Sequence, residues 1–213
     1  MALQIGKNRA QRIMHKYGIK PPRRKGKFFL TKSISSHHYT NLINSLKASK
    51  PNQIFASDLT YLPYQGKNIY LATIEDIFTR EIVSAEISDK HDSVLTLKTI
   101  KKAICNHPEI FHTDQGSEFM AQAVTSFLEK NEVRVSVSDK GSPWQNGYKE
   151  SFFGRFKEEN GDLNRFETLG ELVEEIYAYI HYYNNLRIHT SLRMSPVRFR
   201  LLFSEGLSQV SGS

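Results

Sequence analysis

The sequence contains a single cysteine, Cys105, among 213 residues. One thiol cannot form an internal disulfide or supply a multi-cysteine zinc site, so a bound metal must use carboxylates or histidines. Long apolar runs are also missing. No segment approaches the roughly 18 to 20 residues of a membrane-spanning helix, and the N-terminus lacks the apolar stretch of a secretory signal. These absences argue against a disulfide-stabilised or membrane-embedded protein, and we expect a cytoplasmic one.

Acidic residues are missing from the first 50 positions, which carry twelve Lys and Arg. The chain has 29 basic and 22 acidic residues in all, so residues 51–213 have a net charge of −5. This asymmetry predicts two modules, a basic arm over residues 1–50 that binds a polyanion and a globular domain over residues 51–205. Charge alone leaves open the alternative that the arm is a solvated tail.

Hydrophobic patterning predicts a mixed α/β fold after Pro51. Three strand-length segments rich in Ile, Val, Tyr and Thr are separated by turn residues, which indicates an antiparallel meander. Strand and helix patterns then alternate, which is typical of a sheet with helices on both faces. The expected strands span 53–62, 68–75, 80–88, 109–114 and 133–139, and the expected helices span 8–17, 93–103, 119–131, 148–159 and 168–185.

Three acidic residues stand at positions that suit a functional site. Asp58 lies inside a predicted strand, where an unpaired carboxylate is costly. Asp114 ends another strand, and Glu150 lies near the start of a helix after a loop of turn-forming residues. Taken singly, each is explained more simply as a cap or a solvated charge. The surrounding strings are more specific: SDLTYL, HTDQGSEF and NGYKESFFGRFK, with 35 residues between the second Asp and the Glu.

These strings resemble the DDE transposase and integrase superfamily. In particular, residues 52–196 resemble the catalytic subunit of the bacterial insertion-sequence group typified by insertion sequence three. The match includes DIFTREIVSAEI and a closing YN..R.H..L...P pattern at Tyr183, Asn184, Arg187, His189, Leu192 and Pro196. The resemblance implies an RNase H-like integrase core, in which a five-stranded mixed sheet is flanked by helices and preceded by a short basic helical arm.

The resemblance also implies the activity. We expect a transposase that cleaves DNA strands and transfers them at the ends of an insertion sequence, working as a homo-oligomer on double-stranded DNA in the bacterial nucleoid. Asp58, Asp114 and Glu150 would be the catalytic residues and the ligands of two Mg2+ ions, which Mn2+ would replace. Hard oxygen ligands suit these cations, and a metal pair suits displacement at phosphorus. Whether an upstream-frame partner protein is required stays open.

Two alternatives remain at this stage. The first is a catalytically degenerate remnant that only binds DNA or a partner, and the second is a metal-dependent nuclease without strand transfer. The N-terminus departs from the group, because RAQRIMHKYGIK would be only the last helix of the implied helix-turn-helix region. Gln145 and Phe55 also differ, since many members have Asp and Trp at these positions.

Several further residues are candidates for contacting DNA. Lys157 follows Glu150 by seven residues and shares its helix face, although an exposed lysine is the simpler alternative. Asn146 precedes the same helix and is expected to position that helix or the DNA. In the basic arm, the residues expected to follow a phosphate backbone or enter a minor groove are Arg23, Arg24, Lys25 and Lys27.

Three residues are expected to support the site. His112 lies two residues before Asp114, so it would share that residue's face on a strand, although a packed histidine is the simpler reading. Arg187 and His189 belong to the closing pattern and are expected to orient the active-site helix.

Overall fold

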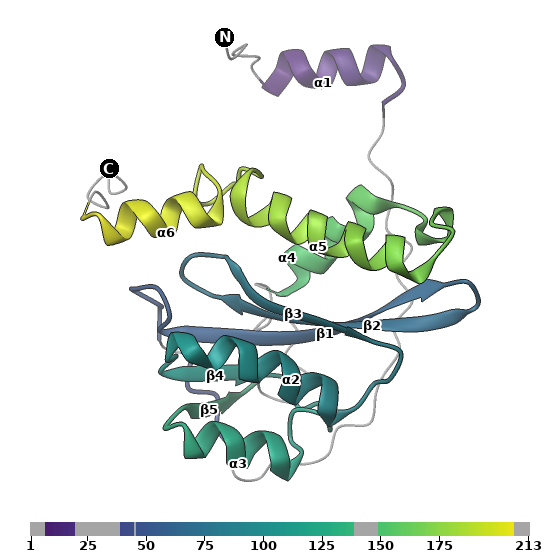
Figure 1. Cartoon of the computed structure of the whole chain (residues 1–213). Coiled ribbons are helices and arrows are strands. Elements are labelled where there is room, and N and C mark those ends of the chain that lie inside the picture. The colour runs from purple at the N-terminus through teal and green to yellow at the C-terminus, as the bar shows by residue number, and fades with distance from the viewer. Residues whose placement is uncertain (1–6, 20–38, 45, 139–148, 207–213) are drawn as a thin grey trace. The chain divides into compact units, whose positions relative to one another are not determined.

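A computed structural model describes residues 7–19, 39–44, 46–138 and 149–206. The chain divides into two compact units, residues 1–32 and residues 33–213. Figure 1 labels the elements along the chain. Their bounds are α1 (Lys7–Lys16), β1 (Ile54–Tyr64), β2 (Lys67–Asp76), β3 (Ile82–Ser88), α2 (Ser93–Ala103), η1 (Ile104–Asn106), β4 (Ile110–Thr113), α3 (Gln122–Lys130), β5 (Arg134–Val137), α4 (Lys149–Asn160), η3 (Leu163–Arg165), α5 (Leu169–Asn185) and α6 (Pro196–Ser204).

The first unit contains helix α1, which carries basic residues His15 and Lys16 in its last turn. Basic side chains there interact favourably with the helix dipole. The helix ends at Lys16, and the turn after it contains Gly18, whose φ of 65° is a left-handed conformation that glycine adopts without strain. This agrees with the helix expected over 8–17. Among the described helices of the chain, none is both long and apolar enough to cross a membrane.

The second unit is built on a five-stranded sheet in the order β3-β2-β1-β4-β5. Strands β1, β2 and β3 form the predicted antiparallel meander, while β4 and β5 run parallel to β1. Parallel neighbours need crossover connections, and α2 and α3 provide them on one side of the sheet (Figure 1). The predicted mixed sheet with flanking helices is therefore confirmed.

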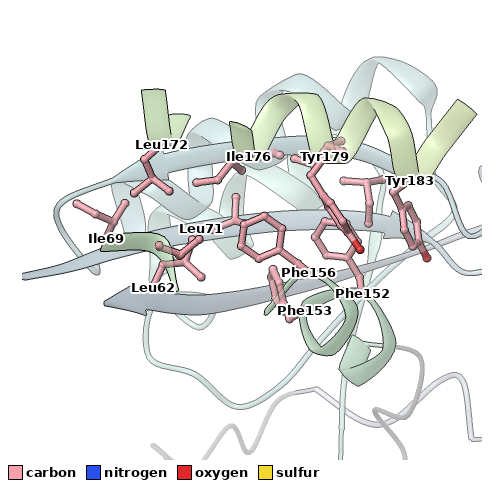
Figure 2. Packing of buried hydrophobic residues seen from close by; sticks show 14 of the residues in the cluster. Leu62, Ile69, Leu71, Phe152, Phe153, Phe156, Leu172, Ile176, Tyr179 and Tyr183 are labelled. Carbon is pink, nitrogen blue, oxygen red and sulfur yellow. The ribbon is translucent and has the colours of Figure 1, made fainter. Parts of the chain in front are cut away.

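The opposite face of the sheet is covered by α4 and α5. Three phenylalanines of α4 are buried between the sheet and α5, namely Phe152, Phe153 and Phe156. In Figure 2 the side chains of α5 point toward the strands, where they meet these rings. The aromatic residues pack edge to face, with 5.1 Å between the centroids of Phe156 and Tyr179. This core fixes α4 against β1 and β2.

A second core lies under α2 and α3. Its buried members include Phe55 of β1, Phe111 of β4 and Leu128 of α3. Successive residues of a strand point to opposite faces, so Phe55 and Phe111 point to this side while their neighbours point to the α4 side. Side chains on both faces of the central strands are thus buried where β1 and β4 begin, which explains the apolar sequences Ile54-Phe55-Ala56 and Ile110-Phe111.

The segment before β1 packs against the sheet. Leu42, Ile43 and Ala48 contact a small buried cluster. The backbone N–H of Val137 donates to the carbonyl of Thr40 at 3.2 Å, next to the last strand β5. The division of the chain into units falls between residues 32 and 33, while the functional boundary at residue 50 stays a prediction.

Two helices differ from the sequence expectation. Helix α3 begins at Gln122, three residues later than expected, because Phe119 and Met120 belong to a turn in which both N–H groups donate to the carbonyl of Gly116. Helix α6 was not expected. Its sequence starts with Pro196 at the first helical position, where the missing N–H costs nothing, and this was the available signal.

The buried core makes a direct stability prediction. Leu128 is 1% exposed in α3, whereas Leu201 is 49% exposed in α6. We expect Leu128→Ala to lower the free energy of unfolding by about 2–5 kcal/mol because it removes buried apolar contacts and leaves a cavity. Leu201→Ala is the matched control and should change it by less than about 1 kcal/mol. Urea denaturation followed by circular dichroism measures both, and equal losses would contradict the assigned core.

Candidate active site

Asp58 and Asp114 are brought together by the pairing of β1 with β4. The strands are parallel, with Ala56 opposite His112. Asp58 lies two residues beyond Ala56, and Asp114 lies two residues beyond His112, directly after the last residue of β4. Side chains two residues apart on a strand share a face, so continuing this register brings Asp58 and Asp114 to the same edge of the sheet. Residue Leu62, on the same face of β1, packs in the core that contains α4.

Each aspartate is oriented by a local backbone bond. The N–H of Leu59 donates to Asp58 Oδ1 at 2.9 Å, and the N–H of Gly116 donates to Asp114 Oδ1 at 2.9 Å. Gly116 also has a steric role, since an added Cβ would lie 3.0 Å from Asp114 Oδ1 and 2.6 Å from Glu118 Oε1. A glycine thus allows the chain to turn closely around the Asp114 carboxylate.

Helix α4 covers the face on which Asp58 lies. Glu150 is in the first turn of this helix, and its side chain lies outside the described part of the structure. Lys157 is seven residues further on, almost two full turns, so both residues occupy one stripe of the helix. Lys157 Nζ donates to Thr60 Oγ1 of β1 at 2.7 Å. This contact places the Lys157 end of α4 over the strand that carries Asp58.

The electrostatic environment agrees with this proximity. Burial lowers the pKa of Lys157, and the negative charge of Asp58 opposes that shift. Burial raises the pKa of Glu75 on β2 to about 8, despite the opposing charge of Arg80, and Asp58 contributes to the rise. Both residues therefore sense the charge of Asp58, and a pKa of about 8 leaves the Glu75 carboxyl largely protonated at neutral pH.

His112 is buried just before the aspartate pair. A hydrogen bond of 2.9 Å joins its Nδ1 to Ser136 Oγ on β5. Ser136 Oγ also accepts from the backbone N–H of Leu42 at 2.9 Å. The histidine thus belongs to a polar chain that links β4, β5 and the segment before β1. Its supporting role toward the catalytic residues stays a prediction.

Arg187 and His189 have different surroundings. Arg187 follows α5 and donates from Nε and Nη2 to Glu159 Oε1 on α4, at 3.2 and 3.1 Å. His189 instead shapes the next turn: its N–H donates to the carbonyl of Met194, and a 3.0 Å hydrogen bond joins its Nδ1 to Ser191 Oγ. Arg187 therefore contacts the helix that carries Glu150, while His189 organises the loop before α6.

The remaining predicted DNA contacts, Arg23, Arg24, Lys25, Lys27 and Asn146, lie outside the described residues. Sequence reasoning missed Thr60, Glu118 and Glu159. A usable signal existed for Glu159, because an acidic residue in the last turn of a helix opposes the helix dipole and calls for a cationic partner. Thr60 had no such signal, because its contact with Lys157 depends on how α4 crosses β1.

The donor set suits a hard divalent cation. Asp58 and Asp114 supply carboxylate oxygens from neighbouring strands, and such oxygens are the ligands that Mg2+ and Mn2+ prefer. Among the described side chains, no three His, Cys, Asp or Glu residues form a metal-binding group. The Glu150 carboxylate is the predicted third ligand and lies outside that set, so the three-ligand assignment stays a prediction.

The fold is RNase H-like, of the class found in integrase catalytic cores. A chain of the simian T-cell lymphotropic virus intasome in complex with PP2A regulatory subunit B56 gamma has a TM-score of 0.63 and 16% identity, over 92% of this chain and 67% of that one. The HTLV-2 integrase catalytic core domain in complex with magnesium (trimeric form) has a TM-score of 0.56 and 19% identity, over 72% and 99%.

Sequence comparison identifies the family. Two family models described as integrase core domain match residues 48–143 and residues 131–196. The transposase for insertion sequence element IS904 from Lactococcus lactis is 36% identical over 192 residues, which cover 86% of this chain and 76% of that protein. The chain belongs to the DDE transposases of the insertion-sequence-three group, as its sequence motifs predicted.

The environment of His189 predicts a pH dependence of stability. Burial lowers the pKa of His189, and the positive charges of Arg80 and Arg187 lower it further. The unfolded chain therefore binds a proton more readily than the folded one, so this contribution to stability is present above about pH 6.5 and is lost as the pH falls through the folded pKa. We expect His189→Asn, which keeps an acceptor for Ser191, to lose less stability than the native chain between pH 7.5 and pH 5.

Urea denaturation at each pH measures this effect. The matched control is His181→Asn, at an exposed position of α5. This control should show the same slope of unfolding free energy against pH as the native chain. A slope for His189→Asn equal to that of the native chain would show that the imidazole does not resist protonation.

Proposed function

We propose that this transposase uses Asp58, Asp114 and Glu150 as the catalytic carboxylates for DNA cleavage and strand transfer at the ends of an insertion sequence. One observation supports the assignment: the parallel register of β1 and β4, with Ala56 opposite His112, brings Asp58 opposite Asp114 when it is continued by two residues. Three carboxylates on three elements form a site only if the fold makes them converge, and this register supplies the first half of that convergence.

The three carboxylates would hold two Mg2+ ions, with Mn2+ as a substitute. The HTLV-2 integrase core, which has the same fold, is described in complex with magnesium, and this supports the choice of ion. When bound, such ions activate an attacking oxygen and stabilise the leaving oxygen in displacement at phosphorus. The residues of the chain orient the ligands: Gly116 fixes the Asp114 carboxylate and Leu59 fixes that of Asp58.

Lys157 is the proposed phosphate contact closest to the aspartates. Its ammonium group is held by Thr60 and lies 5.2 Å from the centre of the Tyr61 ring, whose side chain is 46% exposed. A lysine held beside the carboxylates can neutralise a DNA phosphate that enters the site. Asn146 is proposed to position the start of α4 or the DNA, and His112 to support the strand that carries Asp114.

The proposed partners are double-stranded DNA, both element ends and target, and further copies of this chain. Bringing two element ends together requires more than one site, and the simian viral relative is described as an intasome. The basic arm over residues 1–50 would bind DNA, and residues 51–205 would form the catalytic core. We place the reaction in the bacterial cytoplasm at the nucleoid, where the substrate DNA lies. A protein encoded in an upstream reading frame is proposed as a further partner.

The proposed carboxylates can be tested by isosteric substitution. We expect Asp58→Asn, Asp114→Asn and Glu150→Gln each to lower Mn2+-dependent disintegration of a branched DNA oligonucleotide at least about 100-fold, because each removes an anionic oxygen ligand. Gel analysis of the rejoined strand measures the rate. Glu174→Gln, at an exposed position of α5, is the matched control and should retain native activity.

Retention of native activity by any of the three carboxylate variants would remove that residue from the site. A folded, DNA-binding native chain that forms no rejoined strand would favour the degenerate remnant, and cleavage without joining would favour the nuclease.

The arm makes a prediction of its own. If Arg23, Arg24, Lys25 and Lys27 contact phosphates, replacing all four with Ala should reduce the slope of log K against log salt concentration by about 3 to 4, since each contact contributes about 0.9. Fluorescence anisotropy with duplex DNA at several salt concentrations measures the slope. Lys130→Ala, an exposed change on α3, is the control, and an unchanged slope for the fourfold variant would exclude the arm from the interface.

A further inference from the structure

The closing sequence pattern contacts the helix that carries Glu150 at two separate points. The first point is near the start of α4. The ring of Tyr183 packs edge to face on Phe152, with 4.9 Å between the centroids and an interplanar angle of 84°. Both side chains are 2% exposed, and Phe152 is only two residues after Glu150. The contact with Tyr183 therefore helps to position the first turn of the helix.

The second point is near the end of α4. Glu159 Oε1 accepts from both Nε and Nη2 of Arg187, and its Oε2 accepts from the hydroxyl of Tyr179 at 3.0 Å. Both carboxylate oxygens of Glu159 are thus bonded to the α5 region. The guanidinium of Arg187 also lies 6.0 Å from the centre of the Tyr183 ring, which joins the two contact points.

The α5 region is itself tied to the sheet. The side-chain amide of Asn184 accepts from the N–H of Ile82 at 2.9 Å and donates to the carbonyl of the same residue at 3.0 Å. Asn184 is buried, so this pair of bonds is shielded from water and fixes the end of α5 to the start of β3. The contacts between the α5 region and α4 consequently fix the position of α4 relative to the sheet that carries Asp58.

Apolar packing alone would leave the rotation of α4 about its own axis less well defined. The three phenylalanines of the helix attach it to the sheet through contacts that are not directional, and Gly154 lowers the intrinsic stability of the helix. Hydrogen bonds are directional, so the three that Glu159 accepts, at 3.0 to 3.2 Å, resist rotation of the helix about its axis. In addition, Glu159 opposes the helix dipole, and Arg187 offsets that cost.

We propose that Glu159, Tyr179, Asn184 and Arg187 form a clamp that sets the rotation of α4 and so delivers Glu150 to the aspartate pair. These are positioning residues, since their described side-chain hydrogen bonds join them to one another and to Ile82. The proposal rests on the proposed role of Glu150. It gives a function to two residues of the closing pattern, Asn184 and Arg187, and adds Glu159 and Tyr179, which that pattern does not contain.

A double-mutant cycle on the full-length chain tests the clamp. We expect Glu159→Ala and Arg187→Ala each to lower kcat of disintegration by about 10- to 100-fold while KM changes less than about threefold, because misplacing a catalytic group affects the chemical step. The double variant should be no worse than the more affected single variant, since both changes break one contact. Glu159→Gln, which keeps the acceptor oxygen, should recover part of kcat.

Hydrogen exchange provides a readout that does not depend on activity. We expect amides of residues 152–160 to exchange at least about tenfold faster in both single variants, as the helix opens locally more often. The matched control is the pair Glu81 and Arg200, joined at 2.6 Å between the start of β3 and α6. Removing that pair should change neither exchange in α4 nor kcat.

The outcomes separate the clamp from the proposed function. Unchanged exchange in α4 on losing Glu159 or Arg187 would overturn the clamp, and faster exchange with native kcat would show a structural contact without a positioning role. An equal loss of kcat in the control pair would also overturn it. If Glu150→Gln retains activity, the proposed function fails, whereas exchange in α4 still reports on whether the clamp holds the helix.

Discussion

The parallel pairing of β1 with β4 is the constraint on which the rest of this structure depends. It aligns Asp58 with Asp114, and a shift of one residue would send one of them to the face covered by α2 and α3. The register is held by apolar residues on both faces of the two strands, because Phe55 and Phe111 are buried on one side and Ile54 and Ile110 on the other. The core thereby positions two charged groups that contribute nothing to it.

Other buried acids show what structural carboxylates look like in this fold. Asp76 accepts bonds from the N–H groups of Asn52, Phe78 and Thr79, so it holds the turn after β2. Glu86 forms ion pairs with Lys98 and Lys102 of α2. Both carboxylates bind the chain itself. Asp58 and Asp114 also accept local backbone N–H groups, and Asp58 in addition acts on the pKa of Lys157 on α4, a helix from another part of the chain.

The fold of this protein could be predicted from the sequence more fully than the contacts at its candidate site. The strands and most helices follow from apolar periodicity, which burial against one or two layers imposes. Helix α6 was missed because it is short and its pattern is weak. At the site, the local strings around Asp58, Asp114 and Glu150 pointed to the family. The place of Glu159 in the last turn of α4 indicated a cationic partner, but the identity of the partners of Thr60 and Glu159 was not predictable, since they lie 97 and 28 positions away.

The sequence by itself determined the class of fold, the family and the identity of the three candidate carboxylates, because periodicity and local motifs are written in neighbouring residues. Only the tertiary structure decided that β4 pairs with β1 and β5, and in which register the strands lie, and so which side chains meet. It also decided that Arg187 binds Glu159 on α4 whereas His189 shapes a loop. The physical reason is that contacts between distant segments depend on how whole helices and strands pack, which no local pattern specifies.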